Sequence, residues 1–200
     1  REEIRRTGTL ERKSKSKRAL LVMGGSQGAH RLNLAFAEAL GFLKEKMNSW
    51  QIIHLSGGKD YELMVRTYKE AEVEARVYPF LQRMEEAYRE ADLVVSRAGA
   101  TTVAEIMACG LPSILVPYPL ATHHHQEENA RWLERRGAAI TLRERELTGE
   151  KLAKTILSLM ADGERMSRMA EKSRGLGRPE AAETIVARVM ALVTERQGTK

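Results

Sequence analysis

Cysteine is nearly absent from this sequence, and that scarcity limits its chemistry. Cys109 is the only cysteine among 200 residues, so no internal disulfide can form. A chain of this size without disulfides is typical of a reducing compartment. Cys109 falls in the last turn of a predicted helix, where we expect a small core residue.

Long apolar runs and aromatic residues are scarce as well. No apolar run approaches 18 residues, the length that a membrane-spanning helix needs, and residues 1–6 lack the apolar core of a signal peptide. With two Trp, five Tyr and three Phe, the chain offers no stacking platform, so we expect no nucleic-acid partner. Because Arg1 replaces an initiating Met, we expect the chain to be a piece of a longer protein.

The composition that remains is ordinary for a soluble globular domain. Hydrophobic residues make up 42% and charged residues 30%, with a net charge of +6. Basic residues cluster at 12–18, before the first predicted strand. We interpret residues 1–18 as a basic linker segment, and contact with anionic lipid headgroups is the alternative.

Apolar runs and amphipathic segments alternate along the chain. The apolar runs predict strands at residues 18–23, 51–55, 75–80, 93–95, 112–117 and 138–142. The segments between them predict helices at 30–46, 59–71, 81–91, 101–109 and 123–136, followed by a helical tail from 148. This alternation predicts an α/β fold with a Rossmann-like, doubly wound parallel sheet of about six strands. We place this domain at residues 19–178 and a further C-terminal helix within 179–200.

One strand–turn–helix unit carries the main functional signal, Ser96-Arg97-Ala98-Gly99-Ala100-Thr101-Thr102-Val103-Ala104-Glu105. A helix N-terminus after such a turn presents backbone N–H groups and a positive dipole end, which suits a diphosphate. One turn further, Glu105 can accept hydrogen bonds from a ribose diol. The stretch from Thr102 to Glu105 also fits a capping box, and the two interpretations are compatible.

A second unit of this kind contains Gly24-Gly25-Ser26-Gln27-Gly28-Ala29. Its glycines allow close backbone approach, and Ser26 can donate a hydroxyl to a phosphate or sugar. The turn matches neither the dinucleotide fingerprint nor the P-loop. In a doubly wound sheet, however, ligands bind at the carboxyl ends of the strands. Four loops are expected to meet there and together favour a nucleotide site: residues 24–29, 80–84, 97–102 and 118–126.

Three consecutive histidines, His123, His124 and His125, invite a metal-site interpretation. Neighbouring histidines in a loop rarely point at one ion, and no nearby carboxylate pattern completes a site. We therefore expect no metal and no cofactor.

Several motifs, in this order, resemble the MurG family of bacterial glycosyltransferases: Gly24–Ala29, Ser96–Glu105, Gly110-Leu111-Pro112 and His125-Gln126-Glu127-Glu128-Asn129-Ala130. The resemblance covers nearly the whole chain and implies the C-terminal, donor-binding half of a GT-B enzyme. Such enzymes transfer N-acetylglucosamine from UDP-N-acetylglucosamine to lipid I without a metal, forming lipid II of peptidoglycan. An N-terminal domain would bind the acceptor, contact the cytoplasmic face of the bacterial membrane and supply the general base. We expect the chain alone to bind donor without catalysing transfer, and residues 179–200 to pack on that domain.

The resemblance also implies donor-binding roles for individual residues, and none of them is catalytic. Ser26, Gln27 and Gly28 would approach the sugar diphosphate, together with Thr101 and Thr102. Leu81 would present its backbone to uracil, Arg97 would position the pocket, and Glu105 would take the ribose hydroxyls. His125, Gln126 and Asn129 would face the sugar, and Arg1 would also reach the donor.

Two other interpretations remain open. One is a donor-binding subunit of a split, two-chain, lipid-linked UDP-sugar glycosyltransferase. The other is a nucleotide-sugar epimerase of the same architecture. An epimerase would need catalytic carboxylates and histidines from both halves, and the sequence shows no match for them.

Overall fold

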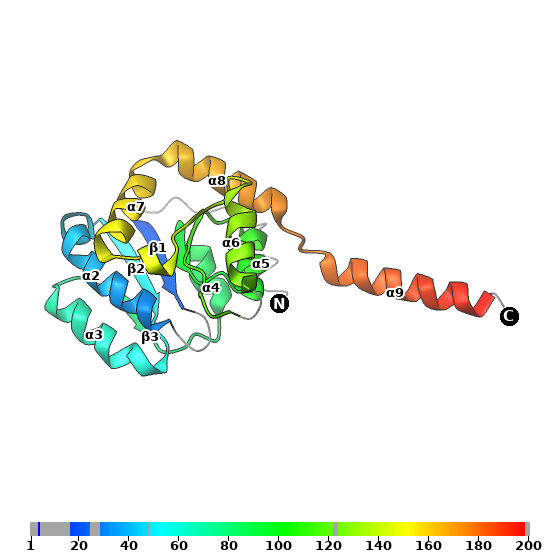
Figure 1. Cartoon of the computed structure of the whole chain (residues 1–200), viewed down its shortest axis with the longest axis horizontal. Helices are drawn as coiled ribbons and strands as arrows, with labels where there is room; N and C mark the ends of the chain where they lie inside the picture. Colours follow the sequence, from blue (N-terminus) through cyan, green and yellow to red (C-terminus); the bar gives the residue numbers. More distant parts are fainter. Residues whose placement is uncertain (1–3, 5–16, 25–28, 48, 122–123, 199–200) are drawn as a thin grey trace.

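Strands and helices alternate in the computed structural model, which describes residues 4, 17–24, 29–47, 49–121 and 124–198 (Figure 1). The strands are β1 (Arg18–Met23), β2 (Trp50–Leu55), β3 (Arg76–Tyr78), β4 (Leu93–Ser96), β5 (Ser113–Leu115) and β6 (Ala139–Thr141). The helices are α2 (His30–Met47), α3 (Tyr61–Glu70), α4 (Met84–Glu90), α5 (Ala100–Cys109), α6 (His125–Glu134), α7 (Gly149–Ala161), α8 (Gly163–Leu176) and α9 (Ala181–Gly198). Short 3-10 segments are η1 (Gly58–Asp60) and η3 (Glu144–Glu146).

The described strands form one parallel sheet in the order β3-β2-β1-β4-β5-β6. Its register places Leu21 of β1 between Ile53 of β2 and Val94 of β4. The chain first winds outward through β2 and β3 and then returns to the other side of β1, so the strand order reverses between β1 and β4. The prediction of a doubly wound, six-stranded parallel sheet is confirmed.

Helices cover both faces of the sheet and enclose two apolar cores (Figure 1). Because side chains alternate along a strand, Leu20 and Val22 of β1 face the core formed with α2, α3 and α7. Leu21 and Met23 face the opposite core, which includes α4, α5 and α6. Strands buried on both faces need continuous apolar runs, and this explains why the sequence pattern located them. Cys109 is buried in the second core, as expected.

Several elements are shorter than the sequence predicts. The strand expected at residues 75–80 ends at Tyr78, because Pro79 has no N–H to donate to a sheet ladder. The helix expected from Leu81 begins at Met84. Likewise, the helix expected from residue 59 begins as the 3-10 segment η1 and becomes α-helical only at Tyr61. Residues 79–83 therefore form a loop after β3.

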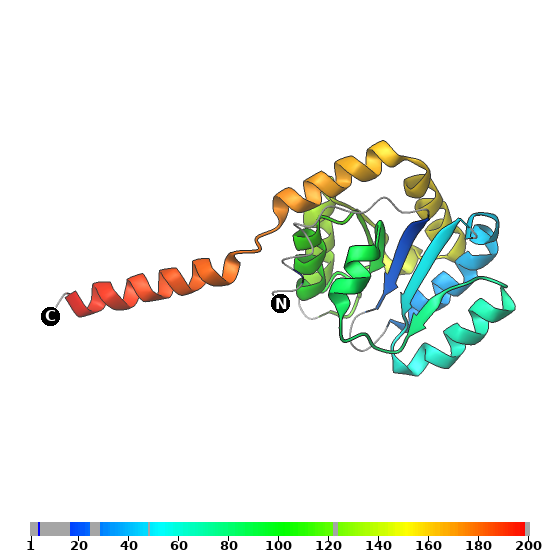
Figure 2. The ribbon, with the colours of Figure 1, turned by 180° about the vertical axis from the view of Figure 1, so that it is seen from behind.

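The helical tail splits into a packed part and a projecting part. α7 packs on α2 and α8 packs on α5, whereas α9 extends away from the rest of the molecule in both views (Figures 1 and 2). The large apolar side chains of α9 are exposed: Ile185, Val186, Val189, Met190, Leu192 and Val193. Within the described part of the chain, no helix combines the length and apolar character needed to cross a bilayer.

Candidate functional site

The loops predicted to gather at one edge of the sheet follow β1, β3, β4 and β5. Because these strands are parallel, all four loops leave the sheet at the same edge. The residues after Met23 and after Ser96 flank the reversal of strand order, where doubly wound folds bind ligands. Three predicted site residues of the first loop, Ser26, Gln27 and Gly28, lie outside the described residues, as does Arg1.

The N-terminus of α5 has the geometry of an anion site. Gly99 is the N-cap, and the first intrahelical hydrogen bond joins the N–H of Val103 to the Gly99 carbonyl over 2.9 Å. The N–H groups of Ala100, Thr101 and Thr102 precede this bond, and Gly99 has no side chain to cap them. The site therefore offers backbone donors and a positive dipole end to a negatively charged group.

Glu105 lies one helical turn further into α5 and is half-buried. Its Oε2 accepts a hydrogen bond of 3.0 Å from the Tyr88 hydroxyl of α4. The capping-box interpretation is wrong, because it needs Thr102 as the N-cap, and Thr102 is the third residue of the helix. The helix starts earlier because Gly99, in the turn after β4, has the extended backbone angles that an N-cap requires.

Arg97 is 8% exposed and joins three loops behind this edge. Its guanidinium donates to the carbonyls of Val116 (3.1 Å) and Pro117 (3.3 Å) and forms an ion pair with Glu144 of η3. The guanidinium carbon also lies 5.4 Å from the ring centre of Tyr118. A planar guanidinium can make all of these contacts at once, so Arg97 fixes the loops after β4, β5 and β6 relative to one another.

The predicted sugar-facing residues lie at the start of α6, and two of them bond to neighbouring loops. The Gln126 side-chain oxygen accepts from the N–H of Tyr118 over 3.0 Å. The Asn129 amide donates to the Ala98 carbonyl over 3.0 Å and so links α6 to the turn before α5. His125 is exposed at the first residue of the helix.

Leu81 lies in the loop between β3 and α4. Its side chain is half-buried and packs against the second core. The neighbouring Phe80 is 64% exposed, although the sequence analysis placed it in a strand. This loop leaves the same edge of the sheet as the α5 turn, on the β3 side of the strand-order reversal.

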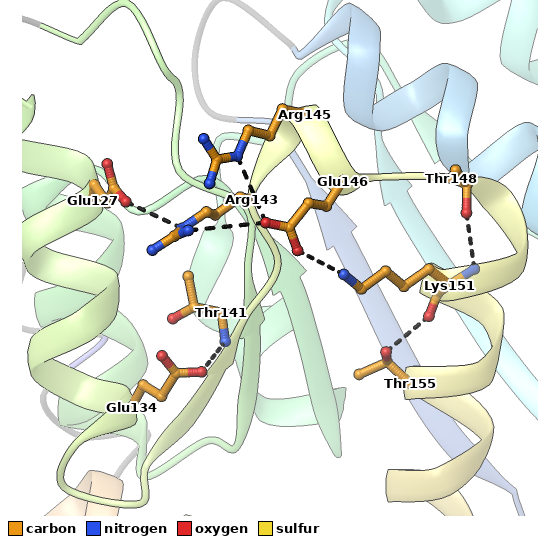
Figure 3. A network of polar contacts seen from close by, with 9 residues as sticks. All are labelled: Glu127, Glu134, Thr141, Arg143, Arg145, Glu146, Thr148, Lys151 and Thr155. Carbon is orange, nitrogen blue, oxygen red and sulfur yellow. Dashed lines mark hydrogen bonds and ion pairs between the residues drawn. The ribbon is translucent and has the colours of Figure 1, made fainter.

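A cavity of about 290 Å³ lies next to the Arg97–Glu144 pair, lined by Pro117, Tyr118, Pro119, His124, Glu127, Arg131, Arg143, Glu144 and Arg145. Its charged wall is held by ion pairs. Glu127 contacts Arg131 (2.8 Å) and Arg143 (3.3 Å). Figure 3 shows Arg143 and Arg145 reaching Glu146, which also pairs with Lys151 of α7 over 2.8 Å. The network connects α6, the exit of β6 and α7.

The described histidines of the 123–125 run take different positions. His124 is the N-cap of α6 and has a left-handed backbone with φ 54°, whereas His125 opens the helix. His123 lies outside the described residues. Among the residues that the structure describes, no group of three or more His, Cys, Asp or Glu side chains is arranged to hold a metal ion.

A buried polar network under the start of α2 was not predicted from the sequence. The Asn33 amide donates to Asp60 Oδ2 (2.7 Å) and to the Ser56 carbonyl (2.8 Å). Asn33 Oδ1 carries no hydrogen, so it accepts from His54 Nε2 (3.1 Å). His54 Nδ1 then accepts from the Tyr68 hydroxyl (2.8 Å). Two features of the sequence could have indicated this network: the polar Asn33 lies within an apolar helix stripe, and His54 lies within an apolar strand.

The nearby charge of Asp60 and the burial of His54 have opposite effects on the pKa of the histidine. Burial lowers the pKa of His54 to about 3, outweighing the attraction of the Asp60 carboxylate, so the imidazole is neutral at pH 7. Asp60 also lies 2.9 Å from Nδ1 of His30, the first residue of α2. The network therefore anchors the N-terminal end of α2, which follows the glycine-rich turn.

Comparisons with known proteins show the family of this chain. A family model described as "Glycosyltransferase family 28 C-terminal domain" matches residues 19–185. Two curated relatives are named UDP-N-acetylglucosamine--N-acetylmuramyl-(pentapeptide) pyrophosphoryl-undecaprenol N-acetylglucosamine transferase. The protein from Geobacter metallireducens is 50% identical over 171 residues, 86% of this chain and 47% of the relative. The protein from Halothermothrix orenii is 46% identical over 178 residues, 86% of this chain and 48% of the relative.

Solved structures show the same relationship. The crystal structure of Acinetobacter baumannii MurG superposes with a TM-score of 0.79 and 31% identity, covering 95% of this chain and 52% of that one. A putative UDP-N-acetylglucosamine 2-epimerase from Listeria monocytogenes shares the fold, with a TM-score of 0.67 and 15% identity over 96% of this chain and 52% of that one. This chain spans about half the length of the curated relatives that it matches. The resemblance seen in the motifs is confirmed, and the chain belongs to the glycosyltransferase family 28 C-terminal domain family.

Proposed function

We propose that this chain is the donor-binding domain of an inverting GT-B glycosyltransferase that transfers N-acetylglucosamine from UDP-N-acetylglucosamine to lipid I. The observation that carries the proposal is the N-terminus of α5 beside the strand-order reversal, with Glu105 one turn behind it. The names of the curated relatives supply the substrates. Their acceptor is an N-acetylmuramyl-pentapeptide carried on pyrophosphoryl-undecaprenol.

We assign the four parts of the donor to different residues at this edge of the sheet. Backbone N–H groups at Thr101 and Thr102 would bind the diphosphate, together with Ser26, Gln27 and Gly28. The Glu105 carboxylate would accept from the ribose hydroxyls. The Leu81 backbone would contact uracil at the loop after β3. His125, Gln126 and Asn129 would border the sugar, and Arg97 would hold the surrounding loops in place.

In the complete enzyme, the C4 hydroxyl of the acceptor's N-acetylmuramic acid would attack the anomeric carbon of the donor with inversion. The bond from that carbon to the UDP oxygen breaks, and UDP leaves with the electron pair. The donors at the α5 N-terminus would stabilise the charge that develops on the diphosphate. The proton of the attacking hydroxyl would pass to a general base outside this chain.

The projecting helix α9 supports a second element of the proposal. Its exposed apolar stripe includes Ile185, Val189 and Val193, which recur on one helical face. An exposed stripe of this kind is typical of a surface that packs against another domain. We place an acceptor-binding N-terminal domain there, and through it a peripheral position at the cytoplasmic face of the bacterial membrane.

Two linked measurements test the proposal. Calorimetry in EDTA should show tighter binding of UDP-N-acetylglucosamine than of UDP-glucose, because the site is proposed to recognise the N-acetyl sugar without a metal. A transfer assay with radiolabelled donor and a lipid I analogue should give no product with this chain alone. Equal affinity for both donors would refute the sugar assignment. Product formation would refute the placement of the general base outside the chain.

A further inference from the structure

Tyr88 connects the two helices that the proposed nucleoside site uses. It belongs to α4, which the chain enters directly from the loop containing Leu81. Its hydroxyl donates to Oε2 of Glu105 in α5 over 3.0 Å. The hydrogen bond therefore joins the helix that follows the proposed uracil-binding loop to the proposed ribose-binding carboxylate.

The ring of Tyr88 is held rigidly. Only 1% of the residue is exposed, and Tyr88 belongs to the second core, where α4 contacts α5 and β1. Close packing restricts such a side chain to one rotamer. Its hydroxyl therefore has a fixed position next to Glu105 of α5.

The side chain of Glu105 has more rotatable bonds than that of Tyr88. Binding a ligand requires these bonds to adopt one conformation, at an entropic cost. A hydrogen bond from a rigid donor fixes the plane of the carboxylate before the ligand arrives. Preorganisation of this kind strengthens binding without adding a contact to the ligand.

We propose that Tyr88 is a positioning residue that orients the Glu105 carboxylate toward the ribose hydroxyls of a uridine diphosphate. The inference rests on the proposed function, because it takes Glu105 as the ribose acceptor. Tyr88 itself touches no ligand in this account. A buried tyrosine hydroxyl also needs a hydrogen-bond partner for stability alone, so the test must separate positioning from folding.

The 2′-hydroxyl of the ribose provides that separation. We would measure the dissociation constants of UDP and of 2′-deoxy-UDP for the 200-residue chain and for three variants: Glu105→Ala, Tyr88→Phe and Tyr68→Phe. The ratio of the two constants reports only on recognition of the 2′-hydroxyl, so a general loss of stability cancels within each protein. Tyr68→Phe is the matched control, because it also removes a buried hydroxyl that donates a hydrogen bond.

The unmodified chain should prefer UDP by roughly ten- to a hundredfold, the effect of one hydrogen bond to a charged group. Glu105→Ala removes the acceptor and should bring the ratio close to one. Tyr88→Phe should lower the ratio by about three- to tenfold, because the carboxylate stays in place but loses the hydrogen bond that orients it. Tyr68→Phe should leave the ratio unchanged.

The possible failures are distinguishable. If the chain does not prefer UDP, or if Glu105→Ala keeps the preference, then Glu105 is not the ribose acceptor, and both the proposed role and the inference fail. If Glu105→Ala removes the preference but Tyr88→Phe keeps it in full, only the positioning role of Tyr88 is overturned. An equal decrease in Tyr88→Phe and Tyr68→Phe would also overturn it, because the effect would then be general loosening.

Discussion

Asn33 donates a hydrogen bond to the carboxylate of Asp60 over 2.7 Å, and both side chains are buried under the start of α2. Asn33 comes from α2 and Asp60 from η1, so the bond ties the loop after β2 to the helix that follows the glycine-rich turn. A buried carboxylate that loses a hydrogen-bond donor keeps its desolvation penalty without compensation.

Replacement of Asn33 should therefore be costly. We expect Asn33→Ala to lower the free energy of unfolding by roughly 2–4 kcal/mol, because Asp60, His54 and the Ser56 carbonyl each lose a partner. Urea denaturation followed by circular dichroism measures this change. The control Thr155→Ala removes an exposed side-chain bond on α7 and should change stability by less than about 0.5 kcal/mol. Similar small effects for both variants would show that the network contributes little.

The buried histidine makes stability depend on pH. The pKa of His54 is lowered from 6.5 to about 3 in the folded chain, so between these values the unfolded chain binds a proton that the folded chain does not. The contribution of neutral His54 to the free energy of unfolding should be fully present above pH 6.5 and should decrease as the pH falls toward 3. The slope is about 1.4 kcal/mol per pH unit, or roughly 2 kcal/mol between pH 6.5 and 5.

Denaturation curves at these two pH values test this prediction in His54→Gln and in the unmodified chain. The variant should be less stable at pH 6.5 but should lack the His54 part of the pH slope. Tyr68→Phe retains the buried imidazole and should keep that slope. The prediction is contradicted if His54→Gln and the unmodified chain lose the same stability on acidification.

Replacement of two glycines by alanine should change the free energy of unfolding in opposite directions. Gly110 ends α5 with φ +59°, and an added Cβ would lie 2.9 Å from Nε and 3.0 Å from Cβ of Arg174 in α8. We expect Gly110→Ala to lower the free energy of unfolding by about 1–3 kcal/mol, from left-handed strain and crowding together. Gly41 lies inside α2 with open space around it, so Gly41→Ala should raise stability by about 0.5–1 kcal/mol. Thermal melts of both variants give the comparison, and a stabilised Gly110→Ala would contradict it.

Arg97 should not tolerate even a conservative change. Lysine cannot reproduce the planar fork that reaches two carbonyls and Glu144 together, so Arg97→Lys should lower the free energy of unfolding by roughly 1–3 kcal/mol. Arg145→Lys is the matched control, since Arg145 is largely exposed and pairs only loosely with Glu146. Chemical denaturation should separate the two variants. Equal stabilities would show that the fork geometry of Arg97 is not needed.

The sequence predicted the sheet because its central strands are buried on both faces and therefore apolar throughout. Residues such as Leu20, Leu21 and Val22 left little ambiguity. The boundaries of loops were harder to predict from the sequence. The start of α4 at Met84 and the extended backbone at Gly99 depend on how the chain leaves neighbouring strands. For this reason the capping box at Thr102 was wrong.

Pairings between distant residues could not be predicted from one sequence. Tyr88 and Glu105 lie 17 positions apart on different helices, and Arg97 and Glu144 lie 47 apart. Each of these side chains has a plausible local explanation as a core aromatic or a surface charge. Only the packed fold shows which of them meet.

The most direct test of the account is a calorimetric titration of the chain with UDP-N-acetylglucosamine in EDTA, run in parallel on Glu105→Gln and on Glu171→Ala, an exposed glutamate of α8. The account predicts binding at one site per chain, weakened roughly tenfold or more by Glu105→Gln and unchanged by Glu171→Ala. An unmodified chain that binds no donor, or a Glu105→Gln variant that binds it as tightly as the unmodified chain, would contradict the proposed donor site.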